Sequence, residues 1–283
     1  MILNDYLKQA REGKYAIGHF NFATEDVLKA IVSAASQSHA PCVMVGTSEG
    51  EADFVGLTEA VALVRAIHDD MQYPVFLNAD HFRSFEKCKA AIDAGYDSII
   101  ADGSRLNLDQ NMVFTKQAVD YARTKSADIS VEGELGYLKG ASEVQAKIEI
   151  SPADYSKPEE VAEFVRQTGV DRMAVVFGNI HGIVTDQIEK LDIEHFLKIA
   201  AAAPEPYYVL HGASGLKDED IRASIEAGIT NVHFNTELRV AYQHELVHQL
   251  SEHPAETTPY KYMGPAAEEV KKLVKAKLAL FKK

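Results

Sequence analysis

Residues 15–26 read YAIGHFNFATED, and this stretch decides between two α/β folds. Its first eight residues are mostly apolar and aromatic, which predicts a buried strand, and a helical pattern begins with the acidic residues at its end. A doubly wound open sheet often carries the motif G-x-G-x-x-G directly after its first strand. Here the motif is absent and the strand runs into NFATED, so a closed barrel is the favoured fold.

Seven further β-rich stretches follow at fairly even spacing. They are PCVMVGT from Pro41, YPVFLNAD from Tyr73, SIIADGS from Ser98, DISVEGEL from Asp128, RMAVVFG from Arg172, YYVLHG from Tyr207 and ITNVHFN from Ile229. Helical patterns lie between them, including those from Glu25, Ser84 and Pro158, and the last two end at Gly95 and Gly169. Eight strands alternating with helices predict an α/β fold of the (β/α)8 TIM-barrel type.

The 283 residues are expected to form one barrel domain, residues 1–283, because no Pro/Gly/Ser-rich linker interrupts them. After the eighth strand come a long helix, a Pro-containing loop and a final helix, GPAAEEVKKLVKAKLALF from Gly264. Residues from about 255 to 283 are therefore predicted to be a C-terminal helical extension. We expect this extension to pack on the barrel or on a second subunit of a homodimer or larger homo-oligomer.

Composition and charge restrict the possible partners. Hydrophobic residues make up 46% and charged residues 25%, as in ordinary soluble proteins, and the net charge of −13 disfavours nucleic acid as a partner. No run approaches the roughly 18 apolar residues of a membrane span, and the start, MILNDYLKQAREGKY, is charged where a signal peptide is apolar. Only two cysteines, Cys42 and Cys88, are present, so we expect a cytoplasmic protein without a disulfide framework.

Reactive residues stand at the ends of the predicted strands, which all meet at one rim of such a barrel. His81, His181 and His211 occupy three of these ends, and three neutral imidazoles with an open fourth position make a catalytic zinc site. Asp80 precedes the first of them, and an aspartate near a metal exchanges protons with a substrate oxygen. The alternative role of Asp80 is to cap the helix that begins near Ser84.

The stretch HGASGLKDEDI after the seventh strand predicts a phosphate site. Its small residues leave backbone N–H groups free at the start of a helix, where barrels commonly bind phosphate together with the loop after the eighth strand. Ser214 and Thr236 add hydroxyl donors at these two places. The alternative interpretation of the stretch is a plain tight turn.

Four motifs in this order resemble a known family. They are Asp80-His81, Glu132-Gly133-Glu134-Leu135-Gly136, Phe177-Gly178-Asn179-Ile180-His181-Gly182 and His211-Gly212-Ala213-Ser214-Gly215. The combination is similar to the class II, zinc-dependent ketose-bisphosphate aldolases, which include fructose- and tagatose-bisphosphate aldolases. The resemblance extends from His19 to Asn235 and beyond, to the glutamate that follows Thr236.

The resemblance implies reversible cleavage of a ketose bisphosphate, such as fructose 1,6-bisphosphate, to dihydroxyacetone phosphate and an aldehyde, such as glyceraldehyde 3-phosphate. It implies that His81, His181 and His211 hold zinc, which polarises the ketone and stabilises the enediolate, and that Asp80 moves the proton. The phosphate-binding residues implied are Gly182, Gly212, Ala213, Ser214, His233, Asn235 and Thr236, with Na⁺ or K⁺ nearby. Asp102 and Glu134 match positions that hold a second or displaced metal ion, and their alternative role is a salt bridge or hydrogen bond under the rim.

This chain also departs from the family pattern. Asn78 stands where the family has histidine, and His233 stands where an asparagine normally contacts the enediolate. Asn235 replaces an aspartate or alanine. Glu143 is the candidate base for the dihydroxyacetone carbon, one place displaced, with a solvated loop glutamate as its alternative. The cation for the second phosphate is open between Arg83, Arg105, Lys139 and Arg239.

Two other functions are compatible with parts of the sequence. His244-Glu245-Leu246-Val247-His248 matches the H-E-x-x-H pattern of zinc peptidases, but the downstream residues QLSEHP lack the third histidine of the longer pattern. The replacements at 78 and 233 raise the alternative of a barrel that binds a sugar phosphate or metal without aldolase turnover. Asp80 and the three histidines argue against that alternative.

Overall fold

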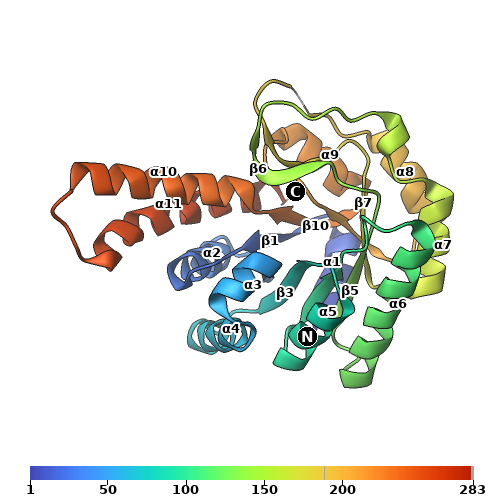
Figure 1. The fold of residues 1–283 in the computed structure, drawn as a ribbon, viewed down its shortest axis with the longest axis horizontal. Coiled ribbons are helices and arrows are strands. Elements are labelled where there is room, and N and C mark those ends of the chain that lie inside the picture. The colour runs from blue at the N-terminus through green and yellow to red at the C-terminus, as the bar shows by residue number, and fades with distance from the viewer. Residues whose placement is uncertain (188, 282–283) are drawn as a thin grey trace.

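Eight parallel strands close into a barrel, as the sequence predicts (Figure 1). The structure is a computed structural model that describes residues 1–187 and 189–281. The barrel runs in the order β1-β10-β9-β7-β5-β4-β3-β2. Its strands are β1 (Ile17–Asn21), β2 (Val43–Ser48), β3 (Val75–Phe82), β4 (Ser98–Ala101), β5 (Ser130–Leu135), β7 (Arg172–Val175), β9 (Tyr207–Leu210) and β10 (Ile229–Phe234). All eight predicted strands are confirmed.

Helices cover the outer face of the barrel, and their boundaries follow the predicted signals. They are α2 (Glu25–Gln37), α3 (Glu49–Val55), α4 (Leu57–Met71), α5 (Phe85–Ala94), α6 (Leu108–Lys125), α7 (Pro158–Thr168), α8 (Ile193–Ala202) and α9 (Asp218–Ala227). Gly95 and Gly169 terminate α5 and α7 in the left-handed conformation, as expected for C-cap glycines. The cap of α5 is Ser84, whose hydroxyl accepts a hydrogen bond from Lys87 N, so Asp80 does not fill that role.

The interior of the barrel carries a polar layer where branched apolar residues are usual. Register pairs join these residues across neighbouring strands: His19 with His233, Asn78 with Ser98, Ser98 with Ser130, and Glu132 with Arg172. All of them are buried. Below this layer α1 (Leu3–Gly13), which the sequence analysis did not predict, packs Leu3 and Leu7 with Ile17 and Met44.

A small parallel sheet lies beside the barrel, formed by β6 (Gly140–Gln145) and β8 (His181–Val184). The segment after β5 was expected to be a loop, so this strand pair is a correction. The pairing is possible because Gly182 has a φ of +89° and lies against the backbone oxygens of Ala141 and Glu143, where a side chain would clash. As a result, the segment that contains Glu143 is joined by backbone hydrogen bonds to the segment that contains His181.

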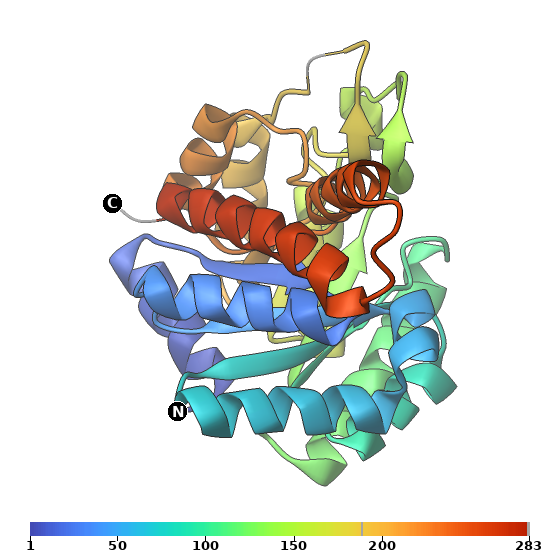
Figure 2. The same cartoon turned by 90° about the vertical axis from the view of Figure 1, so that its left-hand side faces the viewer.

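The chain ends in a helical hairpin that projects from the barrel, made of α10 (Thr236–Glu252) and α11 (Pro259–Leu280) (Figure 1). The final helix begins at Pro259, five residues before the predicted start at Gly264, because a proline at the first helical position favours initiation there. The carboxyl half of α11 buries Val270, Val274 and Leu278, and both views place the helix beside α2 (Figure 2). The outer part of α10 extends away from the barrel and does not lie in the ring of helices around it (Figure 1).

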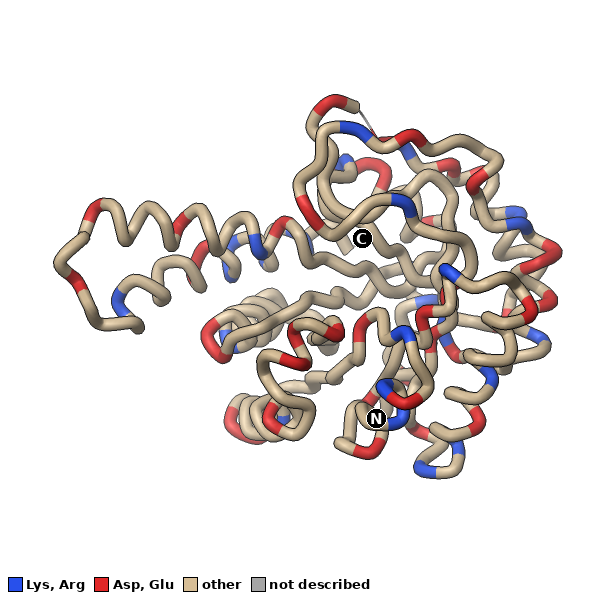
Figure 3. Tube along the Cα trace, in the orientation of Figure 1, with Lys and Arg blue, Asp and Glu red and all other residues tan. Residues whose placement is uncertain are grey.

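Charged residues of both signs are interspersed along the trace (Figure 3). Acidic residues outnumber basic ones, 42 Asp and Glu against 29 Lys and Arg. Among the described residues, no helix is both long and apolar enough to cross a bilayer.

Candidate active site

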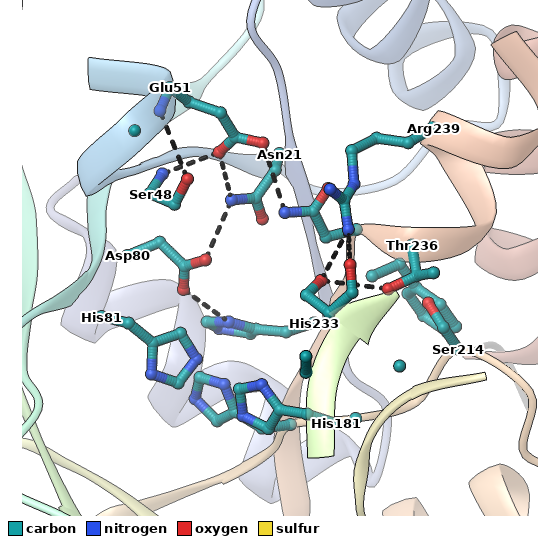
Figure 4. Close-up of a pocket in the computed structure, with 18 of the residues that line it drawn as sticks. Asn21, Ser48, Glu51, Asp80, His81, His181, Ser214, His233, Thr236 and Arg239 are labelled. Carbon is teal, nitrogen blue, oxygen red and sulfur yellow. Dashed lines mark hydrogen bonds and ion pairs between the residues drawn. The ribbon is translucent and has the colours of Figure 1, made fainter. Parts of the chain in front are cut away.

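A cavity of about 620 Å³ opens at the carboxyl ends of the strands (Figure 4). It brings together most of the predicted site residues from distant parts of the chain: Asp80, His81, His181, Gly182, His211, Gly212, Ser214, His233, Asn235 and Thr236. Asp102, Glu134, Glu143 and Ala213 are not among the residues that line it. Such a cavity at this face of the barrel is the expected place for an active site.

The end of β3 turns two adjacent side chains toward one cavity, although neighbours in a regular strand face opposite sides. His81 has a φ of +54°, in the left-handed region that a histidine rarely adopts, and the register with β4 shifts between Ala79 and Phe82. Both Asp80 and His81 consequently line the cavity. A strained backbone of this kind costs about 1–3 kcal/mol and is found mostly at functional sites.

The three predicted zinc ligands meet at this rim. The ring centroid of His81 lies 4.9 Å from that of His181 and 4.7 Å from that of His211. Ligand atoms of His81, His211 and Asp80 lie within 4.8 Å of one another, and so do those of His81, His181 and Glu134. The three histidines are thus divided between two groups that share His81, and each group also contains a carboxylate. Nitrogen and oxygen donors of these types suit a zinc ion.

Two buried carboxylates face one nitrogen of His81. Asp102 Oδ2 lies 3.2 Å and Glu134 Oε2 lies 3.0 Å from His81 Nδ1. Burial opposes the charged imidazole, but Glu134, Asp80 and Asp102 together hold the pKa of His81 well above its ordinary value. Burial and the nearby Asp102 raise the pKa of Glu134. In the absence of a cation, this pocket of negative charge is therefore balanced by the imidazole itself.

His211 and His181 have different surroundings. Glu132 Oε1 lies 2.6 Å from His211 Nε2, an arrangement in which a carboxylate orients a histidine and leaves Nδ1 free for a metal. Asn179 Nδ2 donates to the backbone oxygen of His211 at 3.2 Å and ties the loop after β7 to the end of β9. Burial, followed by the neighbouring His81 and His211, lowers the pKa of His181 to about 3, so this imidazole is neutral and available as a ligand.

Asp80 is held between two strands. Its Oδ2 accepts a hydrogen bond from Asn21 Nδ2 at 2.9 Å, and Oδ1 lies 3.6 Å from His233 Nδ1 without a hydrogen-bond partner among the described residues (Figure 4). Burial alone raises the pKa of Asp80, but His81, His19 and His211 and the bond from Asn21 lower it below its ordinary value. Asp80 is therefore an ionised carboxylate with one unsatisfied oxygen.

The predicted phosphate region lies at the opposite side of the cavity, where α10 begins. Ser214 Oγ accepts a hydrogen bond from Glu237 N at 3.4 Å, and Thr236 Oγ1 lies 3.0 Å from Ser142 Oγ. Gly212 has a φ of +69° and passes so close to the backbone oxygen of Ile180 that no side chain fits. The loop after β9 and the start of α10 thus present backbone and hydroxyl groups to the cavity, while Ala213 is fully buried outside it.

Two of the four candidate cations are already held by other groups. Lys139 pairs with Asp154 at 2.8 Å and does not line the cavity. Arg239 Nη2 donates to Ser142 Oγ at 2.9 Å and to its backbone oxygen, which fastens β6 over the phosphate region. Arg83 and Arg105 line the cavity, and Arg83 is anchored only through Nε, to Asp102 Oδ2 at 3.1 Å. The side chain of Glu143, on β6, is exposed.

The sequence analysis missed several polar residues of the cavity, among them Asn21, Ser48 and Glu51. Asn21 Nδ2 donates both to Asp80 Oδ2 and to Glu51 Oε2, the latter at 2.8 Å. Asn21 and Ser48 end β1 and β2, so the rule that reactive groups stand at strand ends would have found them if it had been applied to the first two strands. The local sequence marks Glu51 only as the third residue of a capping box with Ser48, at the start of α3.

The peptidase-type motif lies elsewhere. His244 and His248 are exposed on α10, on the part of the hairpin that projects from the barrel (Figure 1). Neither of them belongs to any of the possible metal-binding groups found among residues 1–187 and 189–281.

Comparison with known proteins agrees with this geometry over almost the whole chain. The family model for class-II fructose-bisphosphate aldolase matches residues 2–283. The chain belongs to the class-II fructose-bisphosphate aldolase family. It is 34% identical to the fructose-bisphosphate aldolases of Geobacillus stearothermophilus and Staphylococcus aureus, in each case over 99% of this chain and 96% of the relative. It is also similar to the crystal structure of the YdjI aldolase from Escherichia coli K12, with a TM-score of 0.84, 28% identity, and coverage of 99% and 96%.

The protein is therefore a ketose-bisphosphate aldolase, a lyase that performs aldol cleavage. The predicted family and reaction are confirmed, and the peptidase alternative is not supported. Members of this family are generally zinc-dependent, and this aldolase has a His/Asp cluster able to hold a metal ion. Its family acts on phosphorylated sugars, which matches the hydroxyl and backbone donors around the cavity.

Proposed function

We propose that this aldolase cleaves fructose 1,6-bisphosphate reversibly to dihydroxyacetone phosphate and glyceraldehyde 3-phosphate, with one zinc ion held by His81, His181 and His211. The observation that supports this most is the convergence of the three imidazoles from β3, β8 and the end of β9 on one cavity. The donor set fits zinc, since the imidazoles of His181 and His211 and carboxylates lie within ligand reach of His81. A bound zinc ion supplies a Lewis acid that polarises the substrate ketone.

Asp80 is the proposed proton carrier. Its free Oδ1 would accept the proton of the substrate hydroxyl during cleavage and return it to the aldehyde oxygen during condensation. Asn21 holds the other oxygen and so fixes the plane of the carboxylate. Glu143 remains a proposed base for the dihydroxyacetone carbon, and because its side chain is exposed, β6 would have to shift for it to reach the substrate.

The two phosphates are proposed to bind at opposite sides of the cavity. One would be held by the backbone of Gly182, Gly212 and Ala213 and by Ser214, Asn235, Thr236 and His233, with Na⁺ or K⁺ beside it. For the other phosphate we propose Arg83 and Arg105. Lys139 does not line the cavity, and Arg239, which does, already donates from Nη2 to Ser142, whereas Arg83 bonds Asp102 through Nε. Asp102 and Glu134 are proposed as ligands of a second or displaced metal ion, because both face His81 Nδ1.

A coupled assay for triose phosphate tests the proposed function. Fructose and tagatose bisphosphates are supplied in parallel, with the zinc-loaded protein and with the same protein after chelation. We expect cleavage of the fructose substrate, its loss on chelation, and recovery when zinc is added back. Cleavage that persists after complete removal of the metal would contradict the proposed site, and zinc binding without cleavage of either sugar would favour the alternative of a barrel without turnover.

We further propose that the protein is cytoplasmic and forms a homodimer or larger homo-oligomer. Two free buried cysteines support a reducing compartment. Exposed Val247, Leu250 and Tyr260 on the projecting hairpin support self-association, because apolar side chains on a protruding element favour burial against another copy. Sedimentation velocity across a concentration series tests the assembly, and a monomer at every concentration would exclude it.

A further inference from the structure

One arginine lies in the interior of the barrel, on the amino side of the cavity. Arg172 is the first residue of β7, and its side chain is fully buried. Its Nε donates to Ser130 Oγ at 3.2 Å, Nη1 to Glu132 Oε2 at 2.5 Å and to Asn231 Oδ1 at 3.4 Å, and Nη2 to Asn78 Oδ1 at 3.0 Å. One guanidinium thus joins side chains of three other strands.

Three of these partners contact a histidine in turn. Glu132 Oε1 lies 2.6 Å from His211 Nε2, Asn231 Oδ1 lies 2.8 Å from His233 Nε2, and Asn78 Nδ2 lies 3.1 Å from His19 Nε2. His19 and His233 stack with ring centroids 3.7 Å apart, and His233 packs on His211 at 4.2 Å. The three imidazoles form a continuous row that ends at His211, one of the proposed zinc ligands.

The guanidinium determines the direction of these hydrogen bonds because it has donors only. Asn78 must turn its oxygen toward Arg172, so its Nδ2 donates to His19 Nε2 and the proton of that imidazole is on Nδ1. Asn231 also turns its oxygen toward Arg172 while its Nδ2 donates to the backbone oxygen of Ile17 at 2.9 Å. Its oxygen therefore accepts from His233 Nε2, and the proton of that ring is on Nε2.

The hydrogen bonds through Glu132 connect Arg172 to a proposed metal ligand, His211. Arg172 holds Oε2 of Glu132, so Oε1 is left to accept the proton of His211 Nε2, and His211 Nδ1 carries a free lone pair. A carboxylate that orients a metal-binding histidine in this way commonly changes metal affinity tenfold to a hundredfold when it is disturbed. Here the carboxylate is itself oriented by the arginine.

We propose that Arg172 is a positioning residue for the active site: through Glu132, Asn231 and Asn78 it fixes which nitrogen carries the proton in His211, His233 and His19. The part that concerns zinc rests on the proposed function, because it takes His211 as a ligand. The part that concerns His19 and His233 does not. A purely structural role, in which Arg172 only fills the core and neutralises Glu132, predicts a change in stability with the same proton positions.

The first test reads the proton positions in the metal-free full-length protein by ¹⁵N NMR of labelled histidine rings. Glu132→Gln is the reference for the contact through Asn78, because it leaves Arg172 and Asn78 in place, and Arg172→Met is made on that background so that no carboxylate is left unpaired. We expect His19 to carry its proton on Nδ1 in wild type and in Glu132→Gln, and to change to Nε2 when the methionine is added. The matched control is Arg123→Met, since Arg123 pairs with Asp171 away from the cavity.

The second test measures zinc affinity of the same variants by competition with a chelator. Arg172→Lys is added to isolate the effect on zinc, because an ammonium keeps the charge beside Glu132 but cannot reproduce the fork of the guanidinium. We expect it to bind zinc about tenfold to a hundredfold more weakly than wild type, with Arg123→Met equal to wild type. Unchanged proton positions in the folded double variant, together with unchanged zinc affinity in Arg172→Lys, would overturn the proposal. If the double variant does not fold, the proton positions are read in Arg172→Lys, and unchanged positions there would overturn the proposal equally.

The two tests separate the two proposals. A wild-type protein that binds no zinc at these histidines refutes the proposed function, while the NMR comparison still decides the role of Arg172. Zinc binding and cleavage by wild type, combined with NMR spectra that do not respond to Arg172, refute the present inference and leave the proposed function intact.

Discussion

Two regions of this aldolase carry pairs or sets of histidines with the chemistry of metal ligands, and they differ in every structural respect. His81, His181 and His211 are separated by up to 130 positions in the sequence, yet their rings are about 5 Å apart in one cavity. His244 and His248 are one helical turn apart in the sequence, yet both are exposed on α10.

The difference lies in what surrounds each set. At the rim, carboxylates contact His81 and His211, and burial keeps His181 neutral, so the three rings are held in place before any ion arrives. On α10, Glu245 accepts a hydrogen bond from Gln249 at 2.7 Å, and the pair of histidines lacks a buried carboxylate or a third ligand among the described residues. Spacing alone therefore does not make a metal site, and preorganisation by the fold does.

The largest effect is expected from His211→Ala. This change removes a proposed ligand and leaves Glu132 without one of its two partners, so we expect loss of stoichiometric zinc and a fall in cleavage of about 10³-fold or more. Zinc content by mass spectrometry and the coupled assay measure both. His195→Ala is the matched control, since His195 lies on α8 and its ring contacts the backbone of Ser156 and the ring of Tyr155, outside the cavity. If His211→Ala kept the zinc content and cleavage rate of wild type, the rim histidines would not form the metal site.

A smaller effect is expected from Asp80→Asn, which separates proton transfer from metal binding. The amide has the shape of the carboxylate but cannot accept the substrate proton, so kcat is expected to fall about 10²- to 10⁴-fold. Zinc content is expected to stay at the wild-type level, because the three histidines remain. A variant that loses zinc together with its activity would show that Asp80 is a ligand and not a proton carrier.

The sequence is sufficient for the parts of this molecule that depend on local pattern. Apolar runs, helix caps such as Ser84 and terminal glycines such as Gly95 predict the eight strands and their order, and strand ends predict the rim histidines. These features can be found because each is encoded within a few neighbouring residues and because a closed barrel brings all strand ends together.

What the sequence does not contain is the partner of each side chain. The β-rich stretch RMAVVFG predicts a strand but does not indicate what Arg172 contacts. The side chain reaches Asn78 and Asn231 only because the barrel closes. In the same way, Glu51 reaches Asn21 and Asn235 only after α3 has docked. The pairing of β6 with β8 depends on close backbone approach at Gly182, which a pattern of side chains does not record.

A third prediction extends the comparison between buried and exposed groups to a carboxyl. Glu189 is 6% exposed, and burial raises the pKa of its carboxyl to about 8 against the opposing effect of the backbone N–H of Ile180. In the unfolded chain the pKa is ordinary, so between about pH 4.5 and 8 the folded protein retains a proton that the unfolded chain has released. The group thus stabilises the fold most at low pH, and this contribution is lost as the pH rises through about 8.

Glu189→Gln tests this sign, because glutamine keeps the uncharged shape at every pH. Relative to wild type, we expect the variant to gain roughly 1–2 kcal/mol of unfolding free energy between about pH 5 and pH 9, less than the full shift would give because the surroundings relax when the carboxyl ionises. Denaturant melts across this range measure the difference. The control is Glu194→Gln, which makes the same change at an exposed glutamate in the first turn of α8. If the difference in unfolding free energy between Glu189→Gln and wild type does not change with pH, the carboxyl of Glu189 is ionised in the folded state.

The smallest effect is expected from the double variant His244→Ala, His248→Ala. A negligible effect would show that histidines with metal-site spacing do not bind zinc where the fold does not orient them. Both side chains are exposed on a helix and make no described contact with the cavity, so we expect a change in stability within about 0.5 kcal/mol, and zinc content and kcat/KM equal to wild type. The same zinc analysis used for His211→Ala measures it, which makes the two variants a matched pair of histidine removals. If zinc content fell by one equivalent in the double variant while aldolase activity persisted, α10 would hold a metal of its own, and the rule that the fold must preorganise the ligands would fail for this chain.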